Sequence, residues 1–215
     1  MAKLNDKFEF EQDGKTYSLY ELPDGFVIEG DVNLFRKGLT ELPDLSKVTV
    51  RGDFYCSYNK LTSLQGAPRE VGGDFYCRDS ELTSLTGAPQ KVGGDFYCSY
   101  NELTSLTGAP REVGGDFYCS NNDNLFSLFG LPQMQEDKGI YCDDDLMERY
   151  NCLKKEDEYN YYYIEYKDLI ESAKYQSELS VYKIRQKKHE EKKESQAKLK
   201  AEFEAFMKMQ TEERE

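Results

Sequence analysis

The feature that most constrains this chain is a block of 21 residues that recurs through its middle. The block VGGDFYCSYNELTSLTGAPRE returns with few changes, and three of its residue types keep a strict 21-residue step. These are the aspartates (Asp53, Asp74, Asp95, Asp116), the phenylalanines (Phe54, Phe75, Phe96, Phe117) and the cysteines (Cys56, Cys77, Cys98, Cys119). A fixed period of this length is typical of a solenoid, in which each repeat buries one thin layer against its neighbours.

The residues of one repeat predict a β-strand with two faces. Because side chains alternate along a strand, Phe54 and Cys56 should point into the core, while Asp53, Tyr55 and Ser57 point outward on a concave face. Degenerate copies at 31–34 and 140–142 extend the series to six strands of one parallel sheet. About ten residues remain for the return path, and we expect Gly-Ala-Pro to carry it as extended or polyproline backbone.

The flanks predict a cap and a helical extension. FEFEQDGKTYSLYEL alternates around an Asp-Gly pair and indicates a β-hairpin, so residues 1–25 form a cap on the solenoid of residues 26–142. Residues 143–215 are predicted to be helical, beginning at three aspartates, 143–145, whose charges suit a helix start. A second helix should carry one apolar face made of Tyr162, Tyr166, Leu169, Ile170 and Ala173.

The spacing of the apolar residues resembles that of leucine-rich repeats. Phe54, Cys56, Asn59, Leu61 and Leu64 fit the pattern L-x-x-L-x-L-x-x-N-x-L. Over residues 26–142 the chain is similar to the short repeats of secreted bacterial effectors, and the segment VGGDFYCSYN resembles the sequences of phage-encoded repeat proteins. The resemblance implies an α+β leucine-rich-repeat solenoid with a parallel sheet that serves as a binding scaffold, without implying a particular ligand.

Two repeated positions are expected to be purely structural. Cysteine is a small residue that is readily buried, and a linear inward row does not offer the tetrahedral set that zinc requires. The row formed by Asn59, Ser80, Asn101 and Asn122 should bond backbone groups of the adjacent turn, and Ser80 interrupts it. We therefore predict free thiols, no metal and no cofactor.

The aspartate and tyrosine rows are the candidates for function. Carboxylates stacked about 4.8 Å apart repel by about 1 kcal/mol per pair in water, so the aspartates either form an acidic stripe for a basic partner or bond backbone N–H groups beside each Gly-Gly pair. In the return segment the charge alternates instead, through Glu70, Lys91 and Glu112. The tyrosines offer a rigid contact area for binding, although stacking within the row would also stabilise the sheet. The predicted binding residues are Asp53, Tyr55, Tyr58, Asp74, Tyr76, Arg78, Asp95, Tyr97, Tyr100, Asp116, Tyr118 and Tyr141.

Charge and motifs exclude several function classes. A net charge of −13 argues against nucleic acid and anionic membranes as partners and favours a protein with a basic surface. No apolar run approaches the length of about 20 residues that spans a bilayer, and the N-terminus lacks a signal-like stretch, so we expect a cytoplasmic protein. His189 is the one histidine and lies in a charged run, and no nucleophile–base motif is present, so an enzyme is not expected.

The sequence therefore predicts a non-enzymatic protein-binding module. If it is phage-encoded, its target is a host defence or regulatory protein in the host cytoplasm. The alternatives are a bacterial effector-type adaptor and a structural protein that oligomerises through a C-terminal coiled coil. An apolar stripe near the end of the tail either docks a partner or belongs to a frayed terminus; its residues are Leu199, Phe203, Phe206 and Met207.

Overall fold

The computed structural model describes residues 8–150, 155–156, 162–172, 177 and 187. The chain divides into two compact units, residues 1–175 and 176–215, and the account below concerns the first. The predicted tail stripe at Leu199, Phe203, Phe206 and Met207 lies outside the described residues, as does the predicted coiled coil. Among the described residues, no helix is long and apolar enough to cross a membrane.

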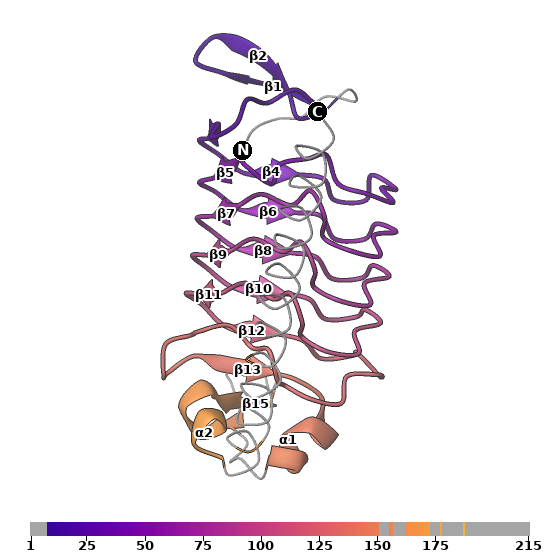
Figure 1. The fold of residues 1–215 in the computed structure, drawn as a ribbon, viewed down its shortest axis with the longest axis vertical. Coiled ribbons are helices and arrows are strands. Elements are labelled where there is room, and N and C mark those ends of the chain that lie inside the picture. The colour runs from indigo at the N-terminus through magenta and orange to yellow at the C-terminus, as the bar shows by residue number, and fades with distance from the viewer. Residues whose placement is uncertain (1–7, 151–154, 157–161, 173–176, 178–186, 188–215) are drawn as a thin grey trace, which may run out of the picture. The chain divides into compact units, whose positions relative to one another are not determined.

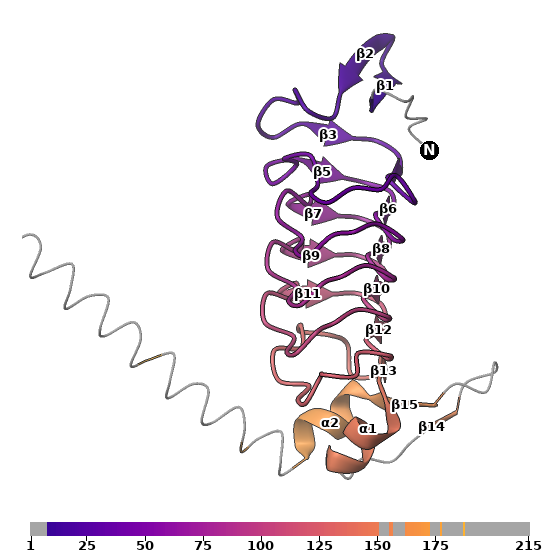
Figure 2. The ribbon, with the colours of Figure 1, turned by 90° about the vertical axis from the view of Figure 1, so that its right-hand side faces the viewer.

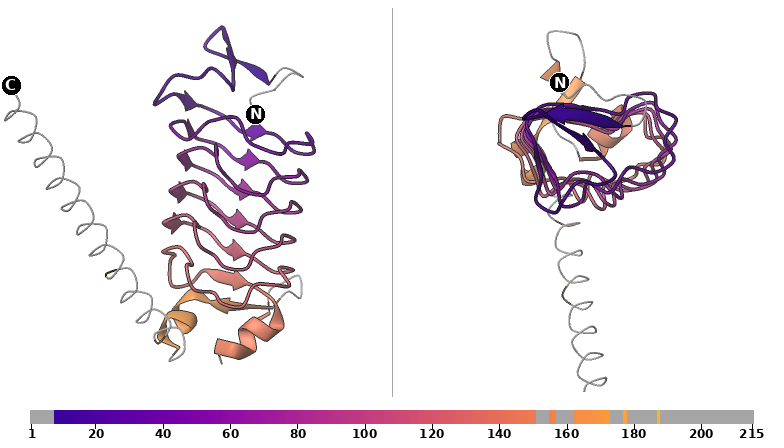
Figure 3. Two further views of the ribbon diagram at one scale, coloured as in Figure 1. Left: turned by 45° about the vertical axis from the view of Figure 1, so that its right-hand side comes forward. Right: turned by 90° about the horizontal axis from the view of Figure 1, so that it is seen from above.

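The first unit is a solenoid of stacked coils with a 21-residue step, capped by a hairpin (Figures 1 and 2). The hairpin strands β1 (Glu9–Gln12) and β2 (Lys15–Ser18) pair antiparallel around Asp13-Gly14, as the alternation predicted. Figure 3 shows the coils superimposed in one outline, with the hairpin across one end. Phe10 of β1 and Leu19, which follows β2, are buried, and Gln12 bonds the backbone of Val27 and Glu29, so the hairpin is joined to the first coil and adds apolar side chains to this end of the core.

Five of the six coils contribute one strand to each of two sheets, and the last coil contributes β13 to the larger sheet alone; the strands of successive coils pair in parallel. The larger sheet contains the six predicted strands: β4 (Val32–Asn33), β6 (Phe54–Tyr55), β8 (Phe75–Tyr76), β10 (Phe96–Tyr97), β12 (Phe117–Tyr118) and β13 (Gly139–Tyr141). The smaller sheet contains β3 (Val27–Ile28), β5 (Thr49–Val50), β7 (Glu70–Val71), β9 (Lys91–Val92) and β11 (Glu112–Val113). Figure 2 shows the two sets of strands on adjoining sides of the column, which has little curvature in this view.

The second sheet corrects the prediction that one sheet and an extended return path make up the repeat. The return path turns at Gly66, where the Ala67 N–H donates to the Leu64 carbonyl at 2.9 Å and glycine takes a φ of +88°. After this turn the chain straightens, and the apolar Val71 enters the core with 2% exposure. The sequence reading missed this strand because two residues are too short a stretch for alternation to be recognised.

The Gly-Gly pairs form the corner between the two sheets. A side chain at Gly72 would collide with the Arg51 carbonyl of the preceding coil, and one at Gly73 would collide with the Asp53 carboxylate. Glycine is therefore required here because the backbones of neighbouring coils approach too closely for a Cβ atom.

The core consists of ladders of identical side chains, as predicted. The Phe54, Phe75, Phe96 and Phe117 rings stack in parallel with centroids 5.3–5.4 Å apart and are fully buried. The cysteine row, which continues to Cys142, is buried and free of disulfides. Burial raises the pKa of the Cys56 and Cys98 thiols far above the usual range, so these thiols remain protonated and unreactive.

The asparagine row links the turns of neighbouring coils, which confirms its predicted structural role. Asn101 donates through Nδ2 to the Cys77 and Cys98 carbonyls, both at 3.0 Å, and its Oδ1 accepts the Leu82 N–H at 3.2 Å. Asn59 and Asn122 bond in the same manner. At Ser80 the shorter side chain leaves a buried hydroxyl that has no hydrogen-bond partner among the described residues.

The far end of the column is closed by strands and two short helices. Helix α1 (Asp144–Tyr150) begins with aspartates in its first turn, as predicted. The predicted second helix is wrong in its first half, because β15 (Tyr162–Glu165) pairs antiparallel with β13 and also with β14 (Lys155–Glu156). Only α2 (Tyr166–Glu171) is helical there. The aromatic and β-branched residues of β15 suit a strand that covers the last coil, with Ile164 fully buried.

Filling the gap in the asparagine row should stabilise the solenoid. In Ser80→Asn, the amide can repeat the bonds that Asn101 makes one coil later, so we expect the free energy of unfolding to rise by about 1 kcal/mol. Ser80→Ala is the control, since it removes an unpartnered hydroxyl and should be nearly neutral. Thermal and urea denaturation of the two variants measure the effect; an asparagine variant that is less stable than the alanine variant would contradict this assignment.

Candidate functional site

The tyrosine row forms a continuous stack along the outward face of the larger sheet. Successive rings from Tyr55 to Tyr141 lie nearly parallel, with centroids 4.3–4.7 Å apart, and Tyr163 of β15 extends the row at 5.2 Å. The rings are partly buried because each covers the face of the next. A partner approaching this face would therefore meet ring edges and hydroxyl groups, and not ring faces.

The aspartate row supports this stack from one side. Asp53 accepts the Asp74 N–H of the following coil through Oδ1 at 2.8 Å and the hydroxyl of Tyr55 through Oδ2 at 2.8 Å. The same pair of bonds repeats at Asp74 and Asp95. The series begins at Asp31, which accepts the Asp53 N–H, and ends at Asp116, which accepts the Gly139 N–H.

These bonds are the structural role that the sequence offered as the alternative to an acidic binding stripe. Each carboxylate accepts a backbone N–H of the next coil, and this donor offsets part of the repulsion between neighbouring aspartates. At the end of the row, burial is the first cause that raises the pKa of Asp116; the neighbouring Asp95 also raises it, and the hydrogen bond from the Gly139 N–H lowers it. The aspartates thus set the geometry of the tyrosines and also give this side of the sheet a negative potential.

The negative potential acts on the tyrosine hydroxyls as well. The hydrogen bond to Asp53, aided by burial, raises the pKa of Tyr55 to about 12. Burial, aided by the charges of Asp116 and Asp95, raises the pKa of Tyr118 to about 12. Both hydroxyls therefore stay protonated well above neutral pH and act as hydrogen-bonding groups on the surface.

The row of residues that follows the strands has an unusual backbone. At the same position of successive coils, Arg36, Tyr58, Asp79, Tyr100 and Asn121 all have φ between +53° and +57°. Asparagine and aspartate tolerate this left-handed conformation, whereas tyrosine and arginine adopt it at a cost of order 1 kcal/mol. The tyrosines at this edge are therefore residues that local stability alone would not select.

Arginine side chains lie among the exposed aromatics of this edge. The guanidinium of Arg36 lies 4.6 Å from the centre of the Tyr58 ring, and that of Arg78 lies 5.8 Å from it on a neighbouring coil. Arg78 also pairs with Asp79 at 3.4 Å.

The prediction for Ser57, which occupies the same repeat position as Arg78, is wrong. Its side chain was expected to point outward, but Ser57 is only 3% exposed.

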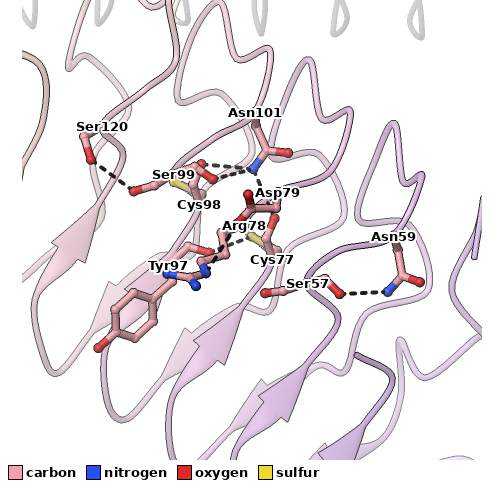
Figure 4. Close-up of polar contacts among 10 residues, drawn as sticks. All are labelled: Ser57, Asn59, Cys77, Arg78, Asp79, Tyr97, Cys98, Ser99, Asn101 and Ser120. Atoms are coloured by element: carbon pink, nitrogen blue, oxygen red, sulfur yellow. Dashed lines mark hydrogen bonds and ion pairs between the residues drawn. The ribbon is translucent and has the colours of Figure 1, made fainter. Parts of the chain in front are cut away.

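A pocket of about 470 Å³ lies where this edge meets the start of α1. Tyr97, Tyr118 and Tyr141 form part of its lining, together with Tyr100 and Arg78. Figure 4 shows Arg78, Tyr97, Ser99 and Ser120 side by side, although they come from three successive coils. The hydroxyls of Ser99 and Ser120 lie 3.3 Å apart. The pocket is therefore assembled across coils.

The predicted binding residues accordingly form one connected face. The four aspartates and five row tyrosines lie together along the larger sheet, and Tyr58, Arg78 and Tyr100 lie along the adjoining turn edge. The sequence reading missed Tyr163 as a member of the stack and Asp143 as a lining residue of the pocket. Tyr163 lies beside Tyr141 because β15 pairs antiparallel with β13. An antiparallel strand that lies outside the repeat cannot be predicted from the 21-residue period.

No group of three or more histidine, cysteine or acidic residues within the described part of the chain is placed to hold a metal ion. His189 falls outside that part.

Comparison with known proteins gave no match: neither a protein-family model, nor a curated protein, nor a solved structure resembles this chain. The 21-residue parallel solenoid is thus observed directly, whereas membership of the leucine-rich-repeat group stays a prediction from the spacing.

Removing one carboxylate should test the structural role of the aspartate row. Asp74→Ala deprives both the Asp95 N–H and the Tyr76 hydroxyl of an acceptor, so we expect a loss of about 2–3 kcal/mol of unfolding free energy. Asp74→Asn retains an oxygen for the N–H and should lose about 1 kcal/mol. Urea denaturation measures both; equal losses would show that the bond between coils contributes nothing.

The raised tyrosine pKa values predict a loss of stability at high pH. An unfolded tyrosine ionises near pH 10, so above this pH the unfolded chain releases protons that folded Tyr55 and Tyr118 retain until about pH 12. The contribution of these two tyrosines to the free energy of unfolding is therefore fully present below pH 10 and is lost as the pH rises toward 12. Tyrosinate absorbance, followed with denaturation midpoints, measures this; Tyr55→Phe should remove one late-titrating group, and an unchanged titration would contradict the assignment.

Proposed function

We propose that this protein is a non-enzymatic binding module that recognises another protein through the tyrosine-lined face of the larger sheet and its turn edge. The observation that carries the proposal is the concentration of tyrosine and arginine, the residue types that dominate binding hot spots, on one rigid face. A stacked row loses little conformational entropy on binding, because its side chains are already held in place.

The charge of this face favours a partner with a basic surface. Burial is the first cause of the raised pKa of Tyr118, and the charges of Asp116 and Asp95 add to it, so negative charge lies close to the row. The net charge of −13 acts in the same direction by steering basic proteins toward the chain. The outward side chains of the smaller sheet carry charges of both signs, and Lys91 pairs with Glu112 at 3.1 Å. That sheet therefore does not present a uniformly negative surface.

The setting of this function follows from the resemblance of the repeats. We propose a phage-encoded protein that acts in the host cytoplasm on a defence or regulatory protein, with a bacterial effector-type adaptor as the alternative. An assembly role through the C-terminal residues is the alternative of a different class. It predicts a stable oligomer that dissociates when residues 185–215 are removed, and light scattering on the full-length and shortened chains distinguishes the two.

The chain offers matched substitutions for testing the binding face. Asn33 occupies the tyrosine position on the first coil, so Tyr76→Asn with Tyr97→Asn places a residue that the fold already accepts there. We expect affinity purification from host lysate to lose its partner by more than about tenfold. The control is Glu70→Thr with Lys91→Thr on the smaller sheet, because Thr49 occupies the equivalent position one coil earlier. This control variant should still recover the partner.

Circular dichroism and thermal denaturation establish that both double variants are folded at the assay temperature. Equal recovery of the same partner by the folded tyrosine variant and by the parent chain would refute the proposed binding face. Loss of the partner only when residues 185–215 are removed would move the contact to the C-terminal region.

A further inference from the structure

The turn edge carries a row of charged side chains whose signs are separated along the column. The row contains the residue that follows each member of the asparagine row, and all four are exposed: Lys60, Glu81, Glu102 and Asp123. The N–H groups of the first three each donate to a leucine carbonyl of the preceding coil at 2.8–3.0 Å, so these residues lie in register. On the first coil, that of β4, the exposed Arg36 and Lys37 lie at this edge. The first two coils are therefore basic here, and the next three are acidic.

These charges are not neutralised within the described part of the chain. Elsewhere, opposite charges on neighbouring coils pair, as Lys91 does with Glu112 at 3.1 Å. Lys60 and Glu81 also lie on neighbouring coils, yet among the described residues neither side chain has an ion pair or a hydrogen bond. The same holds for Glu102, so no donor offsets its repulsion with Glu81, in contrast to the aspartates of the larger sheet. Unpaired charges that are separated in this way suit a second surface with the opposite order of charge.

Exposed aromatic rings accompany the charges at both ends of this edge. Phe35, on the basic end, is 39% exposed, and Tyr100, on the acidic end, is 53% exposed. The guanidinium of Arg36 lies 5.1 Å from the centre of the Phe35 ring and 4.6 Å from that of Tyr58, and it has no ion pair among the described residues. The edge therefore offers apolar contact area beside groups of either sign.

We propose that the turn edge binds the turn edge of a second copy of this chain, with the two columns side by side and antiparallel. A two-fold axis between the second and third coils brings Lys60 of each copy to Glu81 of the other. An axis through the third coil would instead set Glu81 against Glu81 of the second copy. The column has little curvature in Figure 2, so the coils of two copies can match along this edge.

The same register matches the outer parts of the edge. Arg36 of the first coil faces the exposed ring of Tyr100 on the fourth coil of the second copy, where it can make a cation–π contact. Lys37 lies near Glu102 of that copy. Each contact is modest, and each occurs twice in a two-fold pair. The net charge of −13 on each chain opposes association, so we expect a reversible dimer.

This pairing goes beyond the proposed function and leaves the tyrosine row open to the partner. The turn edge adjoins the larger sheet, so the two-fold axis of the antiparallel pair runs along the outward direction of that sheet. Both tyrosine rows consequently face the same side of the dimer. A partner that carries two basic surfaces can then bind both rows at once, which raises its apparent affinity without any new kind of contact.

Charge exchange on the full-length chain tests the register. Analytical ultracentrifugation over a range of concentrations should show a monomer–dimer equilibrium for the parent chain. Lys60→Glu sets two acidic side chains against each other and Glu81→Lys sets two basic ones, so each should raise the dissociation constant of the dimer at least about tenfold. An equimolar mixture of the two variants should dimerise again, because every contact between them joins an acid to a base.

Lys91→Glu and Glu112→Lys make the same changes of charge on the smaller sheet and should leave the dissociation constant unchanged. Circular dichroism establishes that all variants are folded. A parent chain that is monomeric at every concentration overturns the proposal, as does a mixture of the Lys60 and Glu81 variants that stays monomeric. Equal effects of the control variants would attribute association to net charge and overturn it too. An oligomer that is lost only when residues 185–215 are removed would assign assembly to the C-terminal region instead.

Discussion

The strands of successive coils pair in register, so that from β6 to β12 each paired residue lies beside its own counterpart one repeat away. The register pairs Phe54 with Phe75 in the core and Tyr55 with Tyr76 on the surface. For aromatic and apolar residues this arrangement is favourable, because identical flat or branched groups pack closely. For charged residues it is unfavourable, since like charges are brought to about the separation of two strands. Most of the other features of the structure can be understood as responses to this one constraint.

The two sheets respond to the constraint in different ways. On the smaller sheet the sign of the charge alternates, so that Glu70, Lys91 and Glu112 neighbour one another and Lys91 pairs with Glu112. On the larger sheet the aspartates keep one sign, and each uses one oxygen for the backbone of the next coil and, at Asp53, Asp74 and Asp95, the other for a tyrosine hydroxyl. The second solution retains negative charge beneath an ordered aromatic surface. A basic partner would find charge and contact area already arranged, at little entropic cost.

The turn edge shows a further departure from what stability alone favours. Asn101 and its counterparts Asn59 and Asn122 join neighbouring turns through buried hydrogen bonds, and each directly follows a residue in the left-handed conformation. Tyr58 and Tyr100 therefore lie next to the buried amides, in a backbone conformation that suits tyrosine poorly. The pocket exists because four successive coils and the start of α1 contribute to it together.

The sequence by itself determined the period, the parallel stacking, the buried Phe, Cys, Leu and Asn rows and the hairpin cap, because a repeated residue in a repeated unit has a repeated environment. It also placed the tyrosines outward, since period-2 alternation sorts the residues of even a short strand. Only the tertiary structure decided between the two roles of the aspartates, because the choice depends on where the N–H of the next coil lies. The second sheet, the strand at Tyr162–Glu165 and the pocket at Tyr100 were likewise decided there. They arise from contacts between coils or at the end of the stack, where neighbouring residues come from distant parts of the chain and no local pattern records them.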